Sequence, residues 1–272
     1  YLIVNGQKKR FLFNIQSRFY NSEKLIIIYQ SALKQKINFK EKKKWITFVG
    51  KLNKAKGYDI FGKAVIKILD KYPKWKALVI GDERRESMVF KHKNLKLFGF
   101  QSHNKVLKTF KNTSIAVVCS RWDEPLGRTS LEASSNGCAV IISNKGGLPE
   151  TITNGIILKE LNEKELFDEI DLLIKNNMLR KNLQKLSNKN FIHTNQKSSK
   201  EVDLYRDHLL NRSKIIPKMI KNLESLRILH ITNFNERHNG RLFFNTGRRI
   251  NNGFIRLGHS VLELSDRDIL KN

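Results

Sequence analysis

Short apolar runs alternate with amphipathic stretches from Trp45 onward. Helical periodicity fills the gaps between the runs, over 59–72, 102–112 and from Gly127 to Gly137. The runs predict strands: ITFVG (46–50), ALVIG (77–81), LKLFG (95–99), IAVVC (115–119) and AVIIS (139–143). Strands that alternate with helices predict an α/β fold, a doubly wound parallel sheet covered on both faces. In such a sheet the ligand lies beyond the carboxyl ends of the strands.

The rest of the chain divides into further segments. Three polar-faced helices are predicted over 163–176, 179–190 and 198–211, and a basic stretch around Pro217 indicates a linker. The strand pattern then restarts with RILHIT (227–232) and HSVLEL (259–264), which together predict a β-α-β unit too short to bury its own core. We therefore predict four parts: a lead-in over 1–29, a complete α/β domain over 30–212, a linker over 213–225, and a truncated second α/β start over 226–272.

Charge is the unusual feature of the composition. Lys and Arg number 52 against 25 Asp and Glu, which gives a net charge of +27. The lysines are spread along the whole chain, a pattern typical of solvated faces that is also compatible with attraction to anions. A basic amphipathic stretch at residues 8–13 would suit an anionic membrane.

The two cysteines and the apolar runs limit the classes of protein to which the chain can belong. Cys119 and Cys138 each stand in an apolar run, which predicts small buried side chains and neither a disulfide framework nor a metal site. The apolar runs are strand-sized and fall short of the roughly 20 residues that span a bilayer. No secretory signal is visible, and the chain begins with Tyr1. These features predict a cytoplasmic protein, with peripheral contact at the inner membrane compatible with the charge.

The loop GKLNKAKG (50–57) follows the first strand of the α/β domain. Glycines at both ends allow close approach of the backbone to a ligand, and Lys51 and Lys56 can bracket a diphosphate. The loop lacks the Gly-Lys-Ser/Thr ending of a Walker A motif, and the chain has no G-x-G-x-x-G fingerprint for NAD or FAD. Taken alone, a basic loop of this kind is also typical of a solvated surface.

The loop SRWDEPLGRTSLE (120–132) leads into a predicted helix. Glu124 lies on the loop and Glu132 lies eight residues further on, in the first turns of the helix. The amides of Gly127, Arg128 and Thr129 lie between them at the helix N-terminus, where an anion is favoured. The alternative is that Glu124 caps the helix and Glu132 is a solvated helical residue. A third loop, SNKGGLPE (143–150), could face the same ligand or serve as an ordinary connection.

Four segments together resemble the C-terminal, donor-binding domain of retaining GT-B glycosyltransferases of the group 1, or family four, type. They are VGKLNKAKG (49–57), ALVIGD (77–82), LKLFGF (95–100) and VVCSRWDEPLGRTSLEASSNGCAVIISNKGGLPE (117–150), the last of which holds the E-x7-E motif. The resemblance covers roughly residues 24–212. It implies a Rossmann-like domain that binds a nucleotide-diphosphate sugar and transfers the sugar with retention to a glycan or lipid-linked acceptor, in polysaccharide biosynthesis. It also implies no metal and no cofactor beyond the donor substrate.

The resemblance also implies roles for individual residues. Lys51, which stands where the family usually has Arg, and Lys56 would hold the donor diphosphate. Glu124 would contact the donor sugar and Glu132 would bind the ribose hydroxyls. The remaining implied donor contacts, through backbone amides and close approach, are Gly50, Gly127, Arg128 and Thr129. Replacement of Arg by Lys51 keeps the charge and loses the bidentate fork.

The two ends of the chain depart from the family pattern. Most of an acceptor-binding N-terminal domain is missing ahead of residue 24, and residues 226–264 resemble the start of such a domain, with His238, Gly240 and Arg241 in its loop. The chain therefore has partial Rossmann segments at both ends, and an inactive donor-binding fragment is one alternative.

Other classes of protein stay open as alternatives. The nearest is a GT-B-like nucleotide-sugar epimerase, which would isomerise the nucleotide sugar. A nonspecific nucleic-acid binder would account for the charge, but no motif for specific nucleic-acid binding occurs. A metal-dependent transferase would use the D-x-D at residues 266–268, a pattern that is more typical of a solvated turn.

Overall fold

The computed structural model describes residues 2–4, 25–83, 85, 88–213, 224–232 and 246–265. The chain forms two compact units, Tyr1–Arg206 and Asp207–Asn272. Several residues singled out from the sequence lie outside the described residues: the stretch 8–13, Pro217, His238, Gly240, Arg241 and the D-x-D at 266–268.

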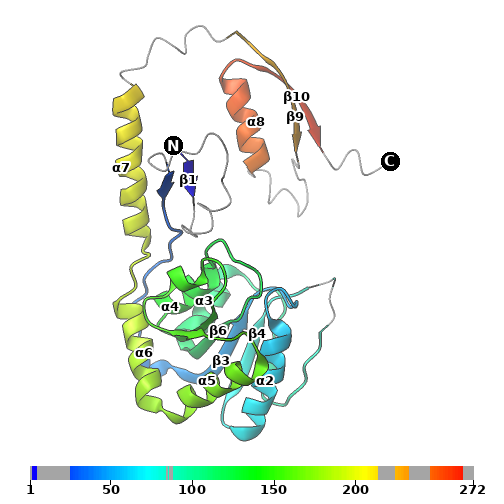
Figure 1. Cartoon of the computed structure of the whole chain (residues 1–272), viewed down its shortest axis with the longest axis vertical. Coiled ribbons are helices and arrows are strands. Elements are labelled where there is room, and N and C mark those ends of the chain that lie inside the picture. The colour runs from blue at the N-terminus through cyan, green and yellow to red at the C-terminus, as the bar shows by residue number, and fades with distance from the viewer. Residues whose placement is uncertain are drawn as a thin grey trace. The chain divides into compact units, whose positions relative to one another are not determined.

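The first unit is built on a six-stranded parallel sheet, with the strand order β5-β4-β3-β6-β7-β8 (Figure 1). Its strands are β3 (Lys43–Val49), β4 (Lys76–Ile80), β5 (Leu95–Leu97), β6 (Thr113–Val118), β7 (Ala139–Ser143) and β8 (Ile156–Leu158). The first five lie at the runs that the sequence pattern identified. The edge strand β8 was not predicted, because three residues after Gly155 give no period-two pattern to recognise. The doubly wound parallel α/β fold is thus confirmed.

The helices of the first unit follow the predicted stripes within a few residues. They are α2 (Tyr58–Lys71), α3 (His103–Asn112), α4 (Arg128–Ser135), α5 (Glu163–Lys175) and α6 (Asn177–Lys189), with short 3-10 helices at Phe39–Glu41 and Leu148–Thr151. The next helix, α7 (Asn195–Ser213), begins in this unit and ends past Arg206. Gly137 follows α4 with a φ of +65°, the left-handed conformation expected of a residue that ends a helix. Ser102 is the N-cap of α3, and its side chain makes no capping hydrogen bond.

Both faces of the sheet are covered, because alternate residues of each strand point to opposite sides. Ile115 and Val117 of β6 pack in the same core cluster as the apolar stripes of α2 and α5. The residue between them, Ala116, packs in a second cluster with side chains of α3 and α4. Burial on both faces explains why these strands are continuous apolar runs.

Two smaller sheets complete the described structure. β1 (Leu2–Val4) pairs in parallel with β2 (Leu25–Ile27). In the second unit, β9 (Arg227–Thr232) and β10 (Ser260–Ser265) form a parallel pair, with α8 (Thr246–Arg256) between them in sequence. The strand-helix-strand order agrees with the sequence pattern. No helix among the described residues is long and apolar enough to span a bilayer.

Candidate functional site

Three loops converge at the carboxyl ends of β3, β6 and β7. A pocket of about 200 Å³ opens between the first two loops and the end of the sheet. Its lining residues are Phe48, Val49, Gly50, Lys56, Val118, Ser120, Glu124, Gly127, Arg128 and Thr129. This position is the one expected for a ligand of a doubly wound sheet.

The loop after β3 is held tightly against the end of β6. Gly57 has a φ of +74°, and a Cβ added there would lie 1.9 Å from the carbonyl oxygen of Cys119. The amides of Arg121 and Trp122 both donate to the carbonyl of Ala55, at 2.8 and 3.1 Å. Only glycine allows the backbone at position 57 to lie this close to the end of β6. This close packing of the loop brings Lys56 to the pocket.

A bidentate ion pair ties the second loop to the start of α2. Arg121 donates through Nη1 and Nη2 to the two carboxylate oxygens of Asp59, at 2.5 and 2.8 Å. Burial raises the pKa of Asp59, but the hydrogen bonds and charge of Arg121 outweigh it, so that the net pKa is lowered. This carboxylate therefore stays ionised and fixes the loop that carries Glu124.

Lys56 and Glu124 face each other across the pocket as an ion pair. Glu124 also accepts a hydrogen bond from the hydroxyl of Ser120, at 3.1 Å. The side chains of Lys56 and Glu124 are 32% and 14% exposed, so the pair is partly shielded from water. One positive and one negative group are thus held in place where a charged ligand would enter.

The N-terminus of α4 forms the other wall of the pocket. Gly127 precedes the helix with φ +92° and ψ +78°, and no side chain caps the first turn. The third loop is bonded to the segment that leads into this helix, because the amide of Gly147 donates to the carbonyl of Glu124 at 2.7 Å. Uncapped amides at a helix N-terminus favour an anion.

Glu132 lies one turn further along α4 and is buried, with 8% exposed surface. Its Oε1 accepts from Arg128 Nη2 at 3.1 Å and lies 2.9 Å from His103 Nε2. No hydrogen bond to Oε2 is present among the described residues. Glu132 is therefore not a solvated helical residue, and its carboxylate is oriented by two side chains.

The structure thus brings together most of the residues that the sequence singled out. Gly50, Lys56, Glu124 and the three residues 127–129 line one pocket. Lys51 is exposed and does not line the pocket. Glu132 does not line the pocket either, but it is hydrogen-bonded to Arg128, which does. Lys51 directly follows Gly50, and the glycine backbone rather than the lysine side chain forms the wall.

Two residues of this region were missed from the sequence. Ser120 holds Glu124 in place, and its position directly after the predicted strand IAVVC (115–119) was a usable signal. His103 contacts Glu132 from α3, and no local pattern points to it. No group of three His, Cys, Asp or Glu side chains that could hold a metal ion occurs within the described ranges.

Comparison with known proteins gives relatives for this domain. The chain is 29% identical over 162 residues to spore coat protein SA of Bacillus subtilis, an alignment that covers 53% of this chain and 43% of that protein. It is 24% identical over 136 residues to the lipopolysaccharide core biosynthesis mannosyltransferase LpsB of Rhizobium meliloti, with 46% and 38% of the two chains covered. The matched region therefore spans less than half the length of either relative.

A structural neighbour has the same fold. The crystal structure of Anabaena HepE in complex with UDP and glucose superposes with a TM-score of 0.62 at 18% sequence identity. The superposition covers 76% of this chain and 62% of that one. The parallel sheet and its helices are thus those of a GT-B domain.

A family model matches over half of the chain. Residues 30–190 match the family described as glycosyl transferases group 1, and the match includes the whole six-stranded sheet and every lining residue of the pocket. The chain therefore belongs to the group 1 glycosyl transferases.

Proposed function

We propose that the pocket binds the diphosphate of a nucleotide sugar, and that the chain is the donor half of a retaining, metal-independent glycosyltransferase. The observation that carries the proposal is the uncapped N-terminus of α4 beside Lys56 and Arg128. Helix amides and two cations together supply the positive potential that a diphosphate needs. The same groups would take the role that a metal ion has in other transferases.

Lys56 changes partners when the donor binds. Its ammonium is paired with Glu124. A diphosphate carries more negative charge than one carboxylate, so it draws Lys56 toward its oxygens. Glu124 then faces the donor sugar, still positioned by Ser120.

Glu132 would bind the ribose of the donor. Its Oε1 is engaged by Arg128 and by His103, whereas Oε2 has no partner among the described residues. A carboxylate oxygen of this kind accepts hydrogen bonds from ribose hydroxyls. The nucleoside would therefore lie on the His103 side of the pocket, with its phosphates toward Gly127.

The transfer step breaks the bond between the anomeric carbon and the diphosphate oxygen. The leaving diphosphate takes the electron pair, and Lys56 and the amides of residues 127–129 stabilise its charge. The acceptor hydroxyl forms its bond to the same face of the anomeric carbon, which retains the configuration. Its proton passes to a leaving-phosphate oxygen, so atoms and charge balance without a further cofactor.

Two of the relatives support a class of donor and acceptor. HepE was crystallised with UDP and glucose, and LpsB is named as a mannosyltransferase of lipopolysaccharide core biosynthesis. We accordingly propose a nucleotide-diphosphate sugar as donor and a glycan or lipid-linked glycan as acceptor. Such an acceptor would be met in the cytoplasm, at the inner face of a membrane.

Thermal stabilisation by nucleotides tests the donor site. The whole chain is heated with UDP, GDP or ADP, and unfolding is followed by tryptophan fluorescence. We expect one of the three nucleotides to raise the melting temperature of the protein. Glu132→Ala is expected to abolish the rise while the variant keeps its far-UV circular dichroism. Glu160→Ala, at an exposed glutamate before α5, removes the same charge outside the site and is the matched control.

Two outcomes would overturn this assignment. One is a folded chain that no nucleoside diphosphate stabilises at millimolar concentration. The other is an equal loss of stabilisation in Glu132→Ala and Glu160→Ala, which would mean that net charge rather than the site binds the nucleotide.

A further inference from the structure

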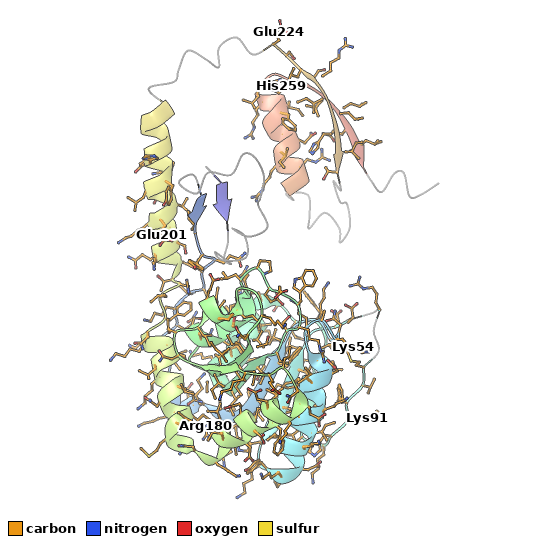
Figure 2. The ribbon with its side chains drawn as sticks, viewed as in Figure 1. Lys54, Lys91, Arg180, Glu201, Glu224 and His259 are labelled. Atoms are coloured by element: carbon orange, nitrogen blue, oxygen red, sulfur yellow. The ribbon has the colours of Figure 1, made fainter. Side chains whose placement is uncertain are left out.

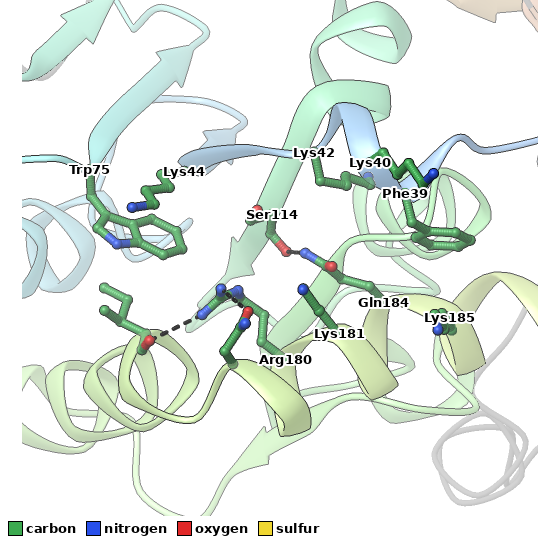
Figure 3. A pocket seen from close by; sticks show the side chains of 12 residues that line it. Phe39, Lys40, Lys42, Lys44, Trp75, Ser114, Arg180, Lys181, Gln184 and Lys185 are labelled. Atoms are coloured by element: carbon green, nitrogen blue, oxygen red, sulfur yellow. Dashed lines mark hydrogen bonds between the residues drawn. The ribbon is translucent and has the colours of Figure 1, made fainter.

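A second and larger recess lies at the amino ends of β3, β4 and β6, at the opposite end of the strands from the donor pocket. Its volume is about 620 Å³ (Figure 3). The lining residues are Phe39, Lys40, Lys42, Lys44, Trp75, Ser114, Ile174, Asn177, Arg180, Lys181, Gln184 and Lys185. Arg180 of this recess and Lys54 of the loop after β3 lie well apart on the domain in Figure 2.

The recess is lined by six cations and no carboxylate. Three of them, at positions 180, 181 and 185, belong to one face of α6, because they lie three, four and eight residues after Asn177, which also lines the recess, and residues so spaced on a helix share a face. Of the other three, Lys40 and Lys42 lie on the segment that leads into β3, and Lys44 lies at the start of β3. Figure 3 shows the two groups facing each other across the recess.

Two of the six cations have structural partners. Lys42 Nζ donates to the carbonyls of Phe110 and Asn136 at 3.0 and 2.7 Å, at the ends of α3 and α4. Arg180 Nη1 donates to two carbonyls in the last turn of α5, and its guanidinium lies 5.1 Å from the centre of the Trp75 ring. Burial lowers the pKa of both groups. Carbonyl partners carry no formal charge, so the positive field of Lys42 and Arg180 is not cancelled.

The other four cations have no structural role of this kind. Lys40, Lys44, Lys181 and Lys185 are exposed, and none makes an ion pair or a side-chain hydrogen bond with any residue that the structure describes. Elsewhere on the domain a carboxylate balances clustered lysines, as Asp171 does for Lys71 and Lys175. Like charges concentrated in a recess without a counter-charge favour a bound anion.

We propose that this recess is a second anion site, which binds a phosphate group of a multiply charged ligand. Ammonium groups from two sides of the recess can contact phosphate oxygens, and the partly exposed side chains of Phe39 and Ile174 offer apolar surface to the rest of the ligand. A volume of about 620 Å³ is within the range of small-molecule sites. The phosphate belongs to a free phosphorylated metabolite or to the headgroup of an anionic lipid. The proposal does not depend on the transfer reaction.

Tryptophan side chains distinguish the two anion sites. Trp75 lies at the recess, whereas Trp122 is exposed on the loop that carries Glu124. The ¹⁵N-labelled chain is titrated with inorganic pyrophosphate, and the indole signal of Trp75 is identified with Trp75→Phe. We expect the Trp75 signal to shift and saturate, whatever happens at Trp122.

A matched pair of variants tests whether the cations of α6 are responsible. Lys181→Gln/Lys185→Gln removes two charges from the recess, and Lys197→Gln/Lys200→Gln removes two exposed charges from α7. Loss of two exposed lysine–phosphate contacts should weaken pyrophosphate binding by about tenfold. The α7 variant, with the same net charge, should bind like the unmodified chain, and thermal melts confirm that both variants are folded.

Vesicles separate the two sources of phosphate. The same variants are co-sedimented with phosphatidylcholine vesicles that contain phosphatidylglycerol, with pure phosphatidylcholine as the reference. Loss of pyrophosphate binding in the α6 variant assigns a free phosphate ligand, and loss of vesicle binding alone assigns a lipid headgroup. If the α6 and α7 variants behave alike with both probes, or if neither probe binds the unmodified chain, the proposal is overturned.

Discussion

Gly57 ends the loop that carries Lys56, and its replacement by alanine separates two physical effects. At φ +74° an alanine is strained in the left-handed region, at a cost of about 1–2 kcal/mol. In addition, its Cβ would lie 1.9 Å from the carbonyl oxygen of Cys119. Backbone must move to relieve that contact, which adds about 2–3 kcal/mol if the clash costs as much as other overpacking.

Gly99 provides the matched control for this prediction. Its φ is +62°, and a Cβ added there meets no atom within 4 Å. Gly99→Ala should therefore lose only the strain energy, about 1–2 kcal/mol of unfolding free energy, against about 3–5 kcal/mol for Gly57→Ala.

Urea unfolding followed by tryptophan fluorescence measures the difference. The three tryptophans, Trp45, Trp75 and Trp122, all belong to the first compact unit, so the signal reports on that unit alone. Equal losses in Gly57→Ala and Gly99→Ala would refute the reasoning, because the contact with Cys119 would then carry no cost. Gly57→Ala should also weaken nucleotide binding, since the loop that moves carries Lys56.

Two further predictions concern titratable groups in the core of the domain. Burial raises the pKa of Asp171, but hydrogen bonds led by that of Lys175 outweigh it and lower the pKa to about 2. Because the folded pKa is depressed, its stabilisation is present above the unfolded value near 4 and is lost as the pH falls toward 2. Asp171→Asn should thus cost about 2 kcal/mol in urea unfolding at pH 7 and much less at pH 2.5; an equal cost at both would contradict the assignment. Burial also raises the pKa of the Cys119 thiol to about 12 and that of Cys138 above its usual range. Neither should react with a thiol reagent at pH 8 until the chain is unfolded in denaturant, and rapid labelling of the folded chain would disprove their burial.

The elements of the fold could be predicted because their signals are local. The apolar run IAVVC became β6, and the stripe over 59–72 became α2, since burial on one or both faces imposes a period on the sequence. The edge strand β8 was not predicted, because its three residues are too few to show a period in the sequence. The division of the chain into four parts stays a prediction.

The candidate site could be predicted only in part. Glycine and proline in the loops after β3, β6 and β7, together with the E-x7-E spacing, pointed to the residues that line the pocket. Sequence spacing treats Lys51 and Lys56 alike, yet only Lys56 turns into the pocket, where Glu124 pairs with it. The roles of these residues in donor binding remain predictions for the nucleotide experiment.

What the sequence determined by itself was the order of strands and helices, the edge of the sheet where the loops meet, and the residue types in those loops. Only the tertiary structure decided which residues distant in sequence share a surface. His103 contacts Glu132, and the cations of α6 line the same recess as those ahead of and at the start of β3, because helices pack across a sheet whose strand order differs from the chain order. Periodicity is a property of neighbouring residues, whereas a contact between distant segments depends on the packing of the whole domain.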